Sequence, residues 1–385
     1  MFFLSCLGRP GGARGGLCKR IVLSVCTGGG PGRRGRRWRF GPRGPWRGTL
    51  TGNRFWRLDR HPEGNRDFAR FLTLCEEAPA PLAPGEVRIA TAWLSMDAGT
   101  RMWMSPRTDG YQPPLPLGAR MVGLVLGRVS ETRDPAFPVG TLVRGFGQWA
   151  EQAVVVPALA GLEAVDEGLA DPRQHFGALG MNAWTAYVGV KEVAAVRPGE
   201  WLAVSAAAGA TGSLACQVGR NLGAKVVGIA GGAEKCRWLV EDLGVDMAID
   251  YRGEDVAARL ATIDGGIGAF FDNVGGPILD AVLPNMAHYG RVAICGMVAG
   301  YDGDAPMPGP ARFDQILMRR LRVEGFFIPD FLERGAEFLP VLRGWLDAGK
   351  LAMRFDETAG IENVLTAYER MLTGKNIGKV VVKVA

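Results

Sequence analysis

Residues 206–235 read AAAGATGSLACQVGRNLGAKVVGIAGGAEK, and this stretch decides the fold of the second half of the chain. The apolar run WLAVSA directly before it predicts a strand, and the glycines that follow predict a tight turn. The pattern then predicts a helix over about 210–222 and a second strand at AKVVGIAG. A strand, a glycine-rich turn, a helix and a parallel strand form the unit that holds the pyrophosphate of a dinucleotide.

The glycines of this turn follow the pattern A-x-G-x-x-G at Ala207, Gly209 and Gly212. We expect Gly209 to let backbone amides approach the pyrophosphate and Gly212 to let the helix pack closely on the strand. The helix N-terminus, beginning at Ala210, adds a partial positive charge. A glycine triad alone also fits a merely tight turn, but its place between a strand and a helix favours nucleotide binding.

Strands and helices alternate from about residue 178 to residue 322, which predicts a parallel, doubly wound sheet of the Rossmann type. Helices are predicted at EKCRWLVEDL and near 254–262 and 277–287, and strands at MAIDY, GAFFDNVG and GRVAICG. Residues 86–160 instead alternate in short bursts separated by Pro/Gly turns, which predicts a β-rich, partly closed barrel. The expected fold class is therefore α/β, with a second, β-rich domain.

The last part of the chain predicts a strand at VEGFFI, a long helix over 331–348 and a final strand at GKVVVKVA. We interpret these elements as the return of the chain to the first domain. The expected organisation then comprises a basic leader, the first part of a substrate domain, a dinucleotide-binding domain and a return segment that completes the substrate domain: 1–52, 53–177, 178–322 and 323–385.

The charge of the chain is unevenly placed, although 47% hydrophobic and 22% charged residues in 385 are typical of a globular protein. Residues 1–52 contain ten Arg and one Lys and no acidic residue, whereas the remainder carries 34 basic and 39 acidic side chains. This Arg/Gly-rich leader buries too little apolar surface to fold, so we expect it to be disordered. Four interpretations of the leader remain open: a passive tail, a misplaced start, a transit sequence or a weak RNA-binding segment.

Cysteine and histidine spacing gives no sign of a metal site. The three histidines stand far apart and form no H-E-x-x-H motif, and no two cysteines are spaced C-x-x-C. We therefore expect neither a zinc site nor a disulfide framework, and we expect a reducing, cytoplasmic compartment. The apolar runs of the leader are shorter than a membrane-spanning helix, so no membrane association is expected. The seven cysteines are Cys6, Cys18, Cys26, Cys75, Cys216, Cys236 and Cys295.

The cofactor is indicated by the end of the second strand, where Gly231 and Gly232 stand at the place of the ribose-binding acid of an NAD site. A carboxylate there would repel the doubly negative 2′-phosphate of NADP, whereas two glycines leave room for it. Lys235, at the start of the next helix, is within reach, and Tyr251, at the end of the third strand, offers a hydroxyl donor. A lysine at a helix start is often merely solvated, but the missing acid favours NADP over NAD.

The motifs AAAGATGS, GIAGGAEK, IDY, FFDNVGG, RVAICGMVAGY and GKNIGKVVVKV, together with the β-rich first domain, resemble the zinc-free medium-chain dehydrogenases and reductases. Within them, the chain is similar to the leukotriene B4 12-hydroxydehydrogenase/prostaglandin reductase group over about residues 53–385. The resemblance implies a two-domain fold with a GroES-like substrate domain, usually dimeric. It also implies NADPH-dependent reduction of the carbon–carbon double bond of α,β-unsaturated ketones and aldehydes.

The resemblance also implies roles for particular residues. Lys235 and Tyr251 match the 2′-phosphate contacts of the group. Where the relatives have LSxDP, however, this chain has LSMDAGTRMWM with Ala98 in place of Pro, which affects the expected loop shape and substrate range. The other residues that match cofactor contacts, from the pyrophosphate to the nicotinamide ribose, are Met181, Thr185, Asn273, Cys295, Gly296 and Asn376.

Tyr301 matches a tyrosine that the group places near the substrate carbonyl. Hydride delivered to the β-carbon of an enone moves negative charge onto the carbonyl oxygen, and a donor aimed at that oxygen lowers the barrier. A phenol, with a pKa of about 10, is protonated at neutral pH and can donate this bond. The alternative is an ordinary exposed loop tyrosine. Cys295 has two alternatives, a nucleophile or a packed thiol beside the cofactor, and its apolar neighbours favour the second.

Two other functions remain open from the sequence. A quinone oxidoreductase of the same superfamily would share every cofactor residue and differ only in reducing quinones faster than enones. A non-enzymatic NADPH-binding or RNA-binding protein would depend on the arginines of the leader. The favoured hypothesis is an NADPH-dependent enone and enal reductase that forms a homodimer.

Overall fold

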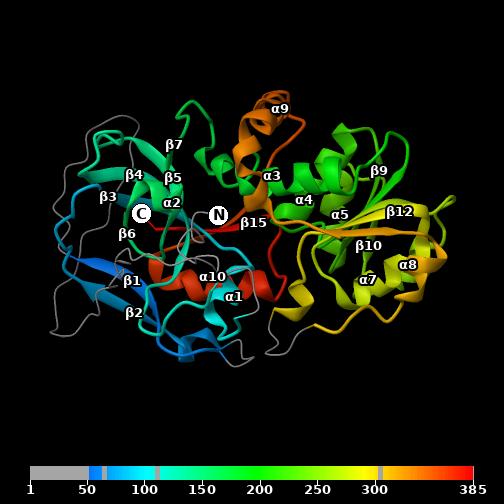
Figure 1. The fold of residues 1–385 in the computed structure, drawn as a ribbon, viewed down its shortest axis with the longest axis horizontal. Coiled ribbons are helices and arrows are strands. Elements are labelled where there is room, and N and C mark those ends of the chain that lie inside the picture. The colour runs from blue at the N-terminus through cyan, green and yellow to red at the C-terminus, as the bar shows by residue number, and fades with distance from the viewer. Residues whose placement is uncertain (1–51, 63–66, 109–112, 302–306, 385) are drawn as a thin grey trace, which may run out of the picture.

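The computed structural model describes residues 52–62, 67–108, 113–301 and 307–384. The predicted disorder of the leader lies outside these residues. Figure 1 shows two lobes side by side: a β-rich lobe formed by the first part of the chain and an α/β lobe formed by its middle. The C-terminal segment, in red, runs from the junction between the lobes back into the β-rich lobe.

The α/β lobe contains, within the described residues, a six-stranded parallel sheet. The strand order steps outward from β8 in both directions, first to β9 and β10 and then to β11, β12 and β13, so the sheet is doubly wound as predicted. The strands span Trp201–Ser205 (β8), Lys225–Ala230 (β9), Met247–Asp250 (β10), Ile267–Asp272 (β11), Met286–Ile294 (β12) and Arg322–Gly325 (β13).

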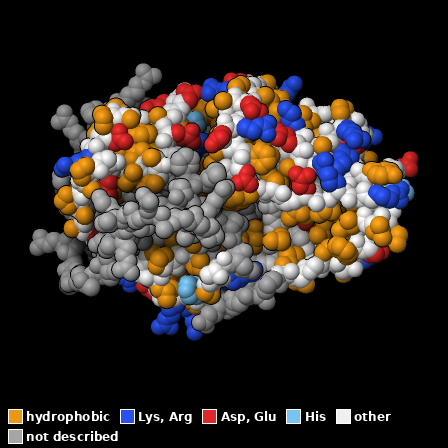
Figure 2. Space-filling view, viewed as in Figure 1, with side chains coloured by type: hydrophobic (Ala, Val, Ile, Leu, Met, Phe, Trp, Pro, Cys, Tyr) orange, Lys and Arg blue, Asp and Glu red, His pale blue; other side chains and the backbone are white. Residues whose placement is uncertain are grey.

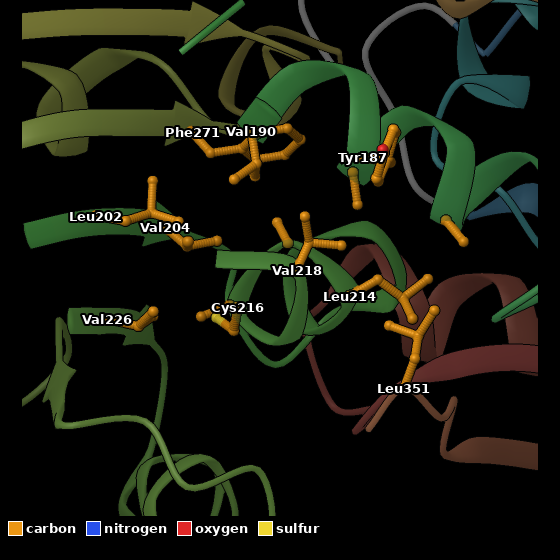
Figure 3. Close-up of a cluster of buried hydrophobic side chains, with 14 of the residues drawn as sticks. Tyr187, Val190, Leu202, Val204, Leu214, Cys216, Val218, Val226, Phe271 and Leu351 are labelled. Carbon is orange, nitrogen blue, oxygen red and sulfur yellow. The ribbon is translucent and has the colours of Figure 1, made fainter. Parts of the chain in front are cut away.

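Helices cover both faces of this sheet because its central strands are apolar on both sides. In β8, Leu202 and Val204 pack with α4 in one buried cluster, whereas Ala203 belongs to a second cluster on the opposite face. Figure 3 shows the first cluster, in which Val218 of α4 and Phe271 of β11 lie near β8. The helices are Met181–Val188 (α3), Ala210–Asn221 (α4), Ala233–Glu241 (α5), Val256–Leu260 (α6), Gly276–Val282 (α7), Asp314–Met318 (α8) and Gly335–Asp347 (α9).

The β-rich lobe contains, among the described residues, a seven-stranded sheet with the order β14-β15-β3-β4-β5-β7, and β6 pairs with β3. A separate hairpin, β1 and β2, packs beside it. The structure confirms the predicted fold class of this domain, which is β-rich, partly closed and GroES-like. Its strands are Asn53–Leu58 (β1), Leu72–Glu77 (β2), Val87–Ser95 (β3), Val122–Thr132 (β4), Leu142–Gln148 (β5), Gln152–Val155 (β6), Glu163–Ala164 (β7), Phe355–Ala359 (β14) and Lys379–Lys383 (β15), and its helices are Thr100–Met104 (α1), Pro157–Ala160 (α2) and Val364–Leu372 (α10).

The return to the β-rich lobe begins later than the expected residue 323. β13 pairs with β12 in the parallel sheet, and α9 packs on α3. The reason is burial: Phe338 and Leu342 of α9 are 1% and 0% exposed in the core of the α/β lobe. Among the described residues, β14, the short turn at Ile361–Asn363, α10 and β15 join the first lobe, where β15 pairs with β3.

Two helices also differ from their predicted bounds. The helix expected over 277–287 ends at Val282, because Pro284 cannot continue it, and β12 already begins at Met286. The long helix expected over 331–348 is a 3₁₀ segment, Ile328–Arg334, followed by α9. None of the helices in the described part of the chain is both long and apolar enough to cross a membrane.

Candidate active site

Most of the predicted site residues lie in the segments that follow β8, β9, β10, β11 and β12, whereas Met181 and Thr185 lie in α3 and Asn376 lies before β15. Because these strands are parallel, their carboxyl ends meet at one edge of the sheet. Ligands of doubly wound sheets bind at this edge, at the point where the strand order reverses. Here the order reverses at β8, so the glycine-rich turn stands at the centre of the candidate site.

The glycine-rich turn leads straight into α4. Gly209 is the N-cap of α4 and no side chain caps the helix, so the first amides from Ala210 onward point into the site. A Cβ on Gly212 would collide with the carbonyl oxygen of Ala206. Ala206 itself has a φ of +48°, a strained conformation for a residue with a side chain. The turn is therefore compact, and it presents backbone donors for an anion.

The start of α3 lies beside this turn. Asn182 Nδ2 donates to Thr211 Oγ1 at 3.0 Å, which joins α3 to α4. Met181 begins α3, and Thr185 Oγ1 donates to the Met181 carbonyl oxygen at 2.7 Å. Both residues are half-buried. The structure thus brings Met181 to the turn, while the hydroxyl of Thr185 is engaged within its own helix.

Tyr251 and Arg252 lie against Gly231, and Lys235 lies near Arg252 at Gly374; we call this part of the site the adenosine end. A Cβ on Gly231 would lie 2.9 Å from Tyr251 Cε1 and 2.8 Å from Arg252 Nε. An acidic side chain at this position, as in an NAD site, therefore needs its neighbours to move. Lys235 Nζ donates to the carbonyl oxygen of Gly374 at 2.9 Å, which ties α5 to the C-terminal segment.

The electrostatics of the adenosine end are positive. Burial lowers the pKa of Lys235, and the charge of Arg252 lowers it further, whereas Asp356 and Glu234 act in the opposite direction. The carboxylate of Asp250, at the end of β10, accepts bonds from the backbone N–H of Gly232 at 2.7 Å and of Arg252 at 3.0 Å. These bonds lower the pKa of Asp250. The acid nearest to the strand end is thus occupied by backbone donors.

Asp272 organises the opposite end of the site, which we call the nicotinamide end. Its carboxylate is 0% exposed and accepts bonds from Ser205 Oγ at 2.7 Å, Val274 N at 2.9 Å and Gly275 N at 3.1 Å. Burial raises the pKa of Asp272, while these bonds act in the opposite direction. The carboxylate fixes the turn that follows β11 to the end of β8.

Asn273, Cys295 and Gly296 are held by the same network. Asn273 Nδ2 donates to the Ser205 carbonyl oxygen at 2.7 Å, and its backbone N–H donates to Ser205 Oγ at 2.8 Å. The backbone N–H groups of Cys295 and Gly296 donate to the Asp272 carbonyl oxygen at 2.8 and 3.1 Å. Three predicted site residues on two strand ends therefore lie together.

Tyr301 lies near this network and directly follows the 3₁₀ turn Val298–Gly300. Its hydroxyl oxygen accepts a bond from Met297 N at 3.4 Å, and a Cβ on Gly296 would lie 3.2 Å from it. Burial raises the pKa of Tyr301, so the phenol keeps its proton at neutral pH. Surrounding protein raises the pKa of Cys295 to about 12, although part of the residue remains accessible, so its thiol is a poor nucleophile.

Gly378 connects the C-terminal segment to the glycine-rich turn, and Asn376 bonds to Gly378. Asn376 Nδ2 donates to the Gly378 carbonyl oxygen at 2.8 Å, and Gly378 N donates to the Ala208 carbonyl oxygen at 2.8 Å. The segment 374–378 thus runs from Lys235 to the glycine-rich turn. The described residues contain no group of three or more His, Cys, Asp and Glu side chains that could hold a metal ion.

Sequence reasoning missed four residues that shape the site. Ser205 and Asp272 hold the nicotinamide end, and Arg252 and Gly374 complete the adenosine end. The acid in FFDNVGG and the arginine directly after IDY were the available signals.

Known proteins are similar to this chain over most of its length. Residues 54–165 match the family described as N-terminal domain of oxidoreductase, and residues 210–343 match Zinc-binding dehydrogenase. The chain is 36% identical to the NADPH-dependent curcumin reductase of Escherichia coli K12, over 86% of this chain and 97% of that one. It is 35% identical to the 2-alkenal reductase (NADP(+)-dependent) of Nicotiana tabacum, over 79% and 89%.

A solved structure is similar over the same length. The crystal structure of CurA in complex with NADPH from Vibrio vulnificus matches with a TM-score of 0.80 and 33% identity, covering 86% of this chain and 99% of that one. Fold, site and similarities define an oxidoreductase of the medium-chain dehydrogenase/reductase class. The chain belongs to the leukotriene B4 12-hydroxydehydrogenase/prostaglandin reductase family, and the family predicted from its motifs is confirmed.

Proposed function

We propose that this protein uses NADPH to reduce the carbon–carbon double bond of α,β-unsaturated ketones and aldehydes. One observation carries the proposal: a positive adenosine end and a protonated phenol, Tyr301, share one edge of the sheet. The comparisons support the same activity, because the relatives from E. coli and tobacco are named as NADPH-dependent curcumin and NADP-dependent 2-alkenal reductases.

The residues of the chain supply binding and charge stabilisation. NADPH, when bound, supplies a hydride for the β-carbon. Lys235 and Tyr251 bind the 2′-phosphate, the first amides of α4 bind the pyrophosphate, and Asn273 makes a further cofactor contact. Tyr301 donates a hydrogen bond to the carbonyl oxygen as its negative charge develops, which is where a preorganised donor lowers the barrier. The remaining cofactor contacts are assigned to Met181, Thr185, Cys295, Gly296 and Asn376.

A substrate screen tests the activity. NADPH oxidation is measured against enals, enones and benzoquinones, and the products are identified. A saturated ketone or aldehyde is the expected product, formed faster than any quinone is reduced. An allylic alcohol as product would contradict conjugate reduction, and faster turnover of benzoquinones would favour a quinone oxidoreductase.

A homodimer belongs to this proposal. β13 lies at the edge of the parallel sheet, and large apolar side chains are exposed near it, among them Phe313, Leu317 and Met318. Figure 2 shows hydrophobic side chains on the surface of the lobe that carries α7 and α8. Antiparallel pairing of two copies about Val323 would place Arg322 of one copy opposite Glu324 of the other.

Sedimentation tests the dimer. The wild-type chain is expected to sediment as a dimer and Leu317→Glu as a monomer, and a monomeric wild type would contradict the proposal. The cytoplasmic location stays a prediction from the cysteine spacing.

A further inference from the structure

The guanidinium of Arg252, at the adenosine end, forms no ion pair with a described carboxylate, although its charge helps to lower the pKa of Asp250. The backbone N–H of Arg252 donates to Asp250, and the guanidinium lies 5.8 Å from the ring centre of Tyr251. The side chain is exposed, and its Nε lies within 2.8 Å of the point where a Cβ on Gly231 would stand. Arg252 and the ring of Tyr251 therefore pack directly against Gly231, which any larger residue would disturb.

Lys235 lies close to Arg252 at a second glycine, Gly374. A Cβ on Gly374 would lie 3.7 Å from Arg252 Nη2 and 3.9 Å from Lys235 Nζ, so the two cations flank one point. The nearest acid acting on Lys235, Asp356, pairs with Arg370 at 3.1 Å instead. Two like charges held together at a half-buried site repel each other, and an anion between them relieves that repulsion.

We propose that Arg252 is a second cation for the 2′-phosphate of NADPH, which binds between Arg252 and Lys235 beside Gly374. This inference rests on the proposed function, because it assumes an NADPH site at the adenosine end. A guanidinium offers a planar fork of donors that matches two phosphate oxygens, whereas an ammonium acts as a point charge. Arg252 thus adds orientation to the charge that Lys235 provides.

Asp250 positions this arginine. Its carboxylate bonds the backbone N–H of Arg252 and of Gly232, and thereby ties the turn after β10 to the turn after β9. The two turns carry the opposite walls of the proposed phosphate site. Asp250 is a positioning residue, since its oxygens are directed to the backbone.

Equilibrium binding to the full-length protein tests the inference without any turnover. Adenosine 2′,5′-bisphosphate carries the 2′-phosphate and adenosine 5′-monophosphate lacks it, so titration calorimetry with both isolates the contribution of that phosphate. Arg252→Gln is expected to weaken the bisphosphate by about tenfold, as for the loss of one charge-assisted bond, and to leave the monophosphate unchanged. Arg252→Lys is expected to recover only part of the loss.

Arg237 supplies a matched control. It is an exposed arginine on α5, two positions after Lys235, and Arg237→Gln removes the same charge. This variant is expected to change the affinity for the bisphosphate by less than about twofold, as surface charges contribute little. Equal losses in the two variants would show a general field effect and overturn the specific contact.

The remaining outcomes separate the two proposals. If wild-type protein prefers the bisphosphate and Arg252→Gln retains that preference, the inference fails and the NADPH reductase proposal stands. If wild-type protein binds both nucleotides equally, the NADPH site fails and the inference fails with it.

Discussion

The two ends of the site select their ligand by different physical means. At the adenosine end, Arg252 is exposed and Lys235 is half-buried, and the ammonium group of Lys235 donates to a backbone carbonyl oxygen. At the nicotinamide end, Asp272 and Ser205 are 0% exposed, and they are hydrogen-bonded to each other. Charge at an exposed site is adjusted easily by one residue, whereas a buried network fails as a unit. We therefore expect the adenosine end to tune cofactor choice and the nicotinamide end to fix the geometry of the site.

The largest expected effect comes from breaking the buried network. Asp272→Ala leaves the donors of Ser205, Val274 and Gly275 without their acceptor, which costs about 1–3 kcal/mol for each buried donor. We expect the free energy of unfolding to fall by at least about 3 kcal/mol, measured by urea unfolding.

The matched control is Asp255→Ala, which removes an exposed carboxylate that caps α6 by accepting a bond from Ala258 N. It is expected to cost about 1 kcal/mol. Equal losses in the two variants would show that the nicotinamide end is no more cooperative than a surface cap.

Tyr301→Phe is expected to have the next largest effect. Loss of one donor to the developing enolate lowers kcat for an enone by about 10²-fold, while the affinity for NADPH changes little. Stopped-flow and steady-state kinetics measure both. Tyr289→Phe, at a tyrosine 68% exposed, is the control. A change confined to KM would mean that Tyr301 holds substrate equally in ground and transition states.

Lys235→Ala probes the adenosine end and is expected to have a smaller effect. KM for NADPH rises by about tenfold, the result of losing one charge-assisted contact, and KM for NADH stays nearly constant. The comparison of both cofactors in one variant gives the measurement. Equal changes would show that Lys235 supports the fold of the site and not the 2′-phosphate.

The fold was predictable where the signal is local. Alternating strands and helices gave the doubly wound sheet, and parallel strands necessarily bring their carboxyl ends to one edge. The return boundary was wrong because it depends on Phe338 and Leu342 finding the core of the other lobe, which no local pattern records. The end of α7 was missed although Pro284 marks it, because the helical pattern was extended past the proline.

The site was likewise predictable where its residues follow strand ends, and not where they depend on contacts between distant parts of the chain. Lys235 and Tyr251 follow strand ends, and each lies near Arg252, while their contact with the cofactor stays a prediction. The bond between Ser205 and Asp272 joins residues 67 positions apart, so only the folded sheet reveals it. Arg252 was overlooked because an arginine after a strand is usually solvated, and its significance appears only beside Lys235 and Gly231.

The smallest expected effect is that of a metal chelator. One matching family is described as Zinc-binding dehydrogenase, yet the described residues hold no cluster of metal-ligating side chains, and His175 Nε2 lies 2.8 Å from the backbone oxygen of Asp166. Since both ends of the site work through hydrogen bonds and side-chain charge, enone reduction is expected to continue unchanged after prolonged treatment with EDTA. Metal analysis of the purified protein is expected to find less than stoichiometric zinc. Inactivation that added zinc reverses would mean that a metal, and not Tyr301, stabilises the oxygen of the substrate.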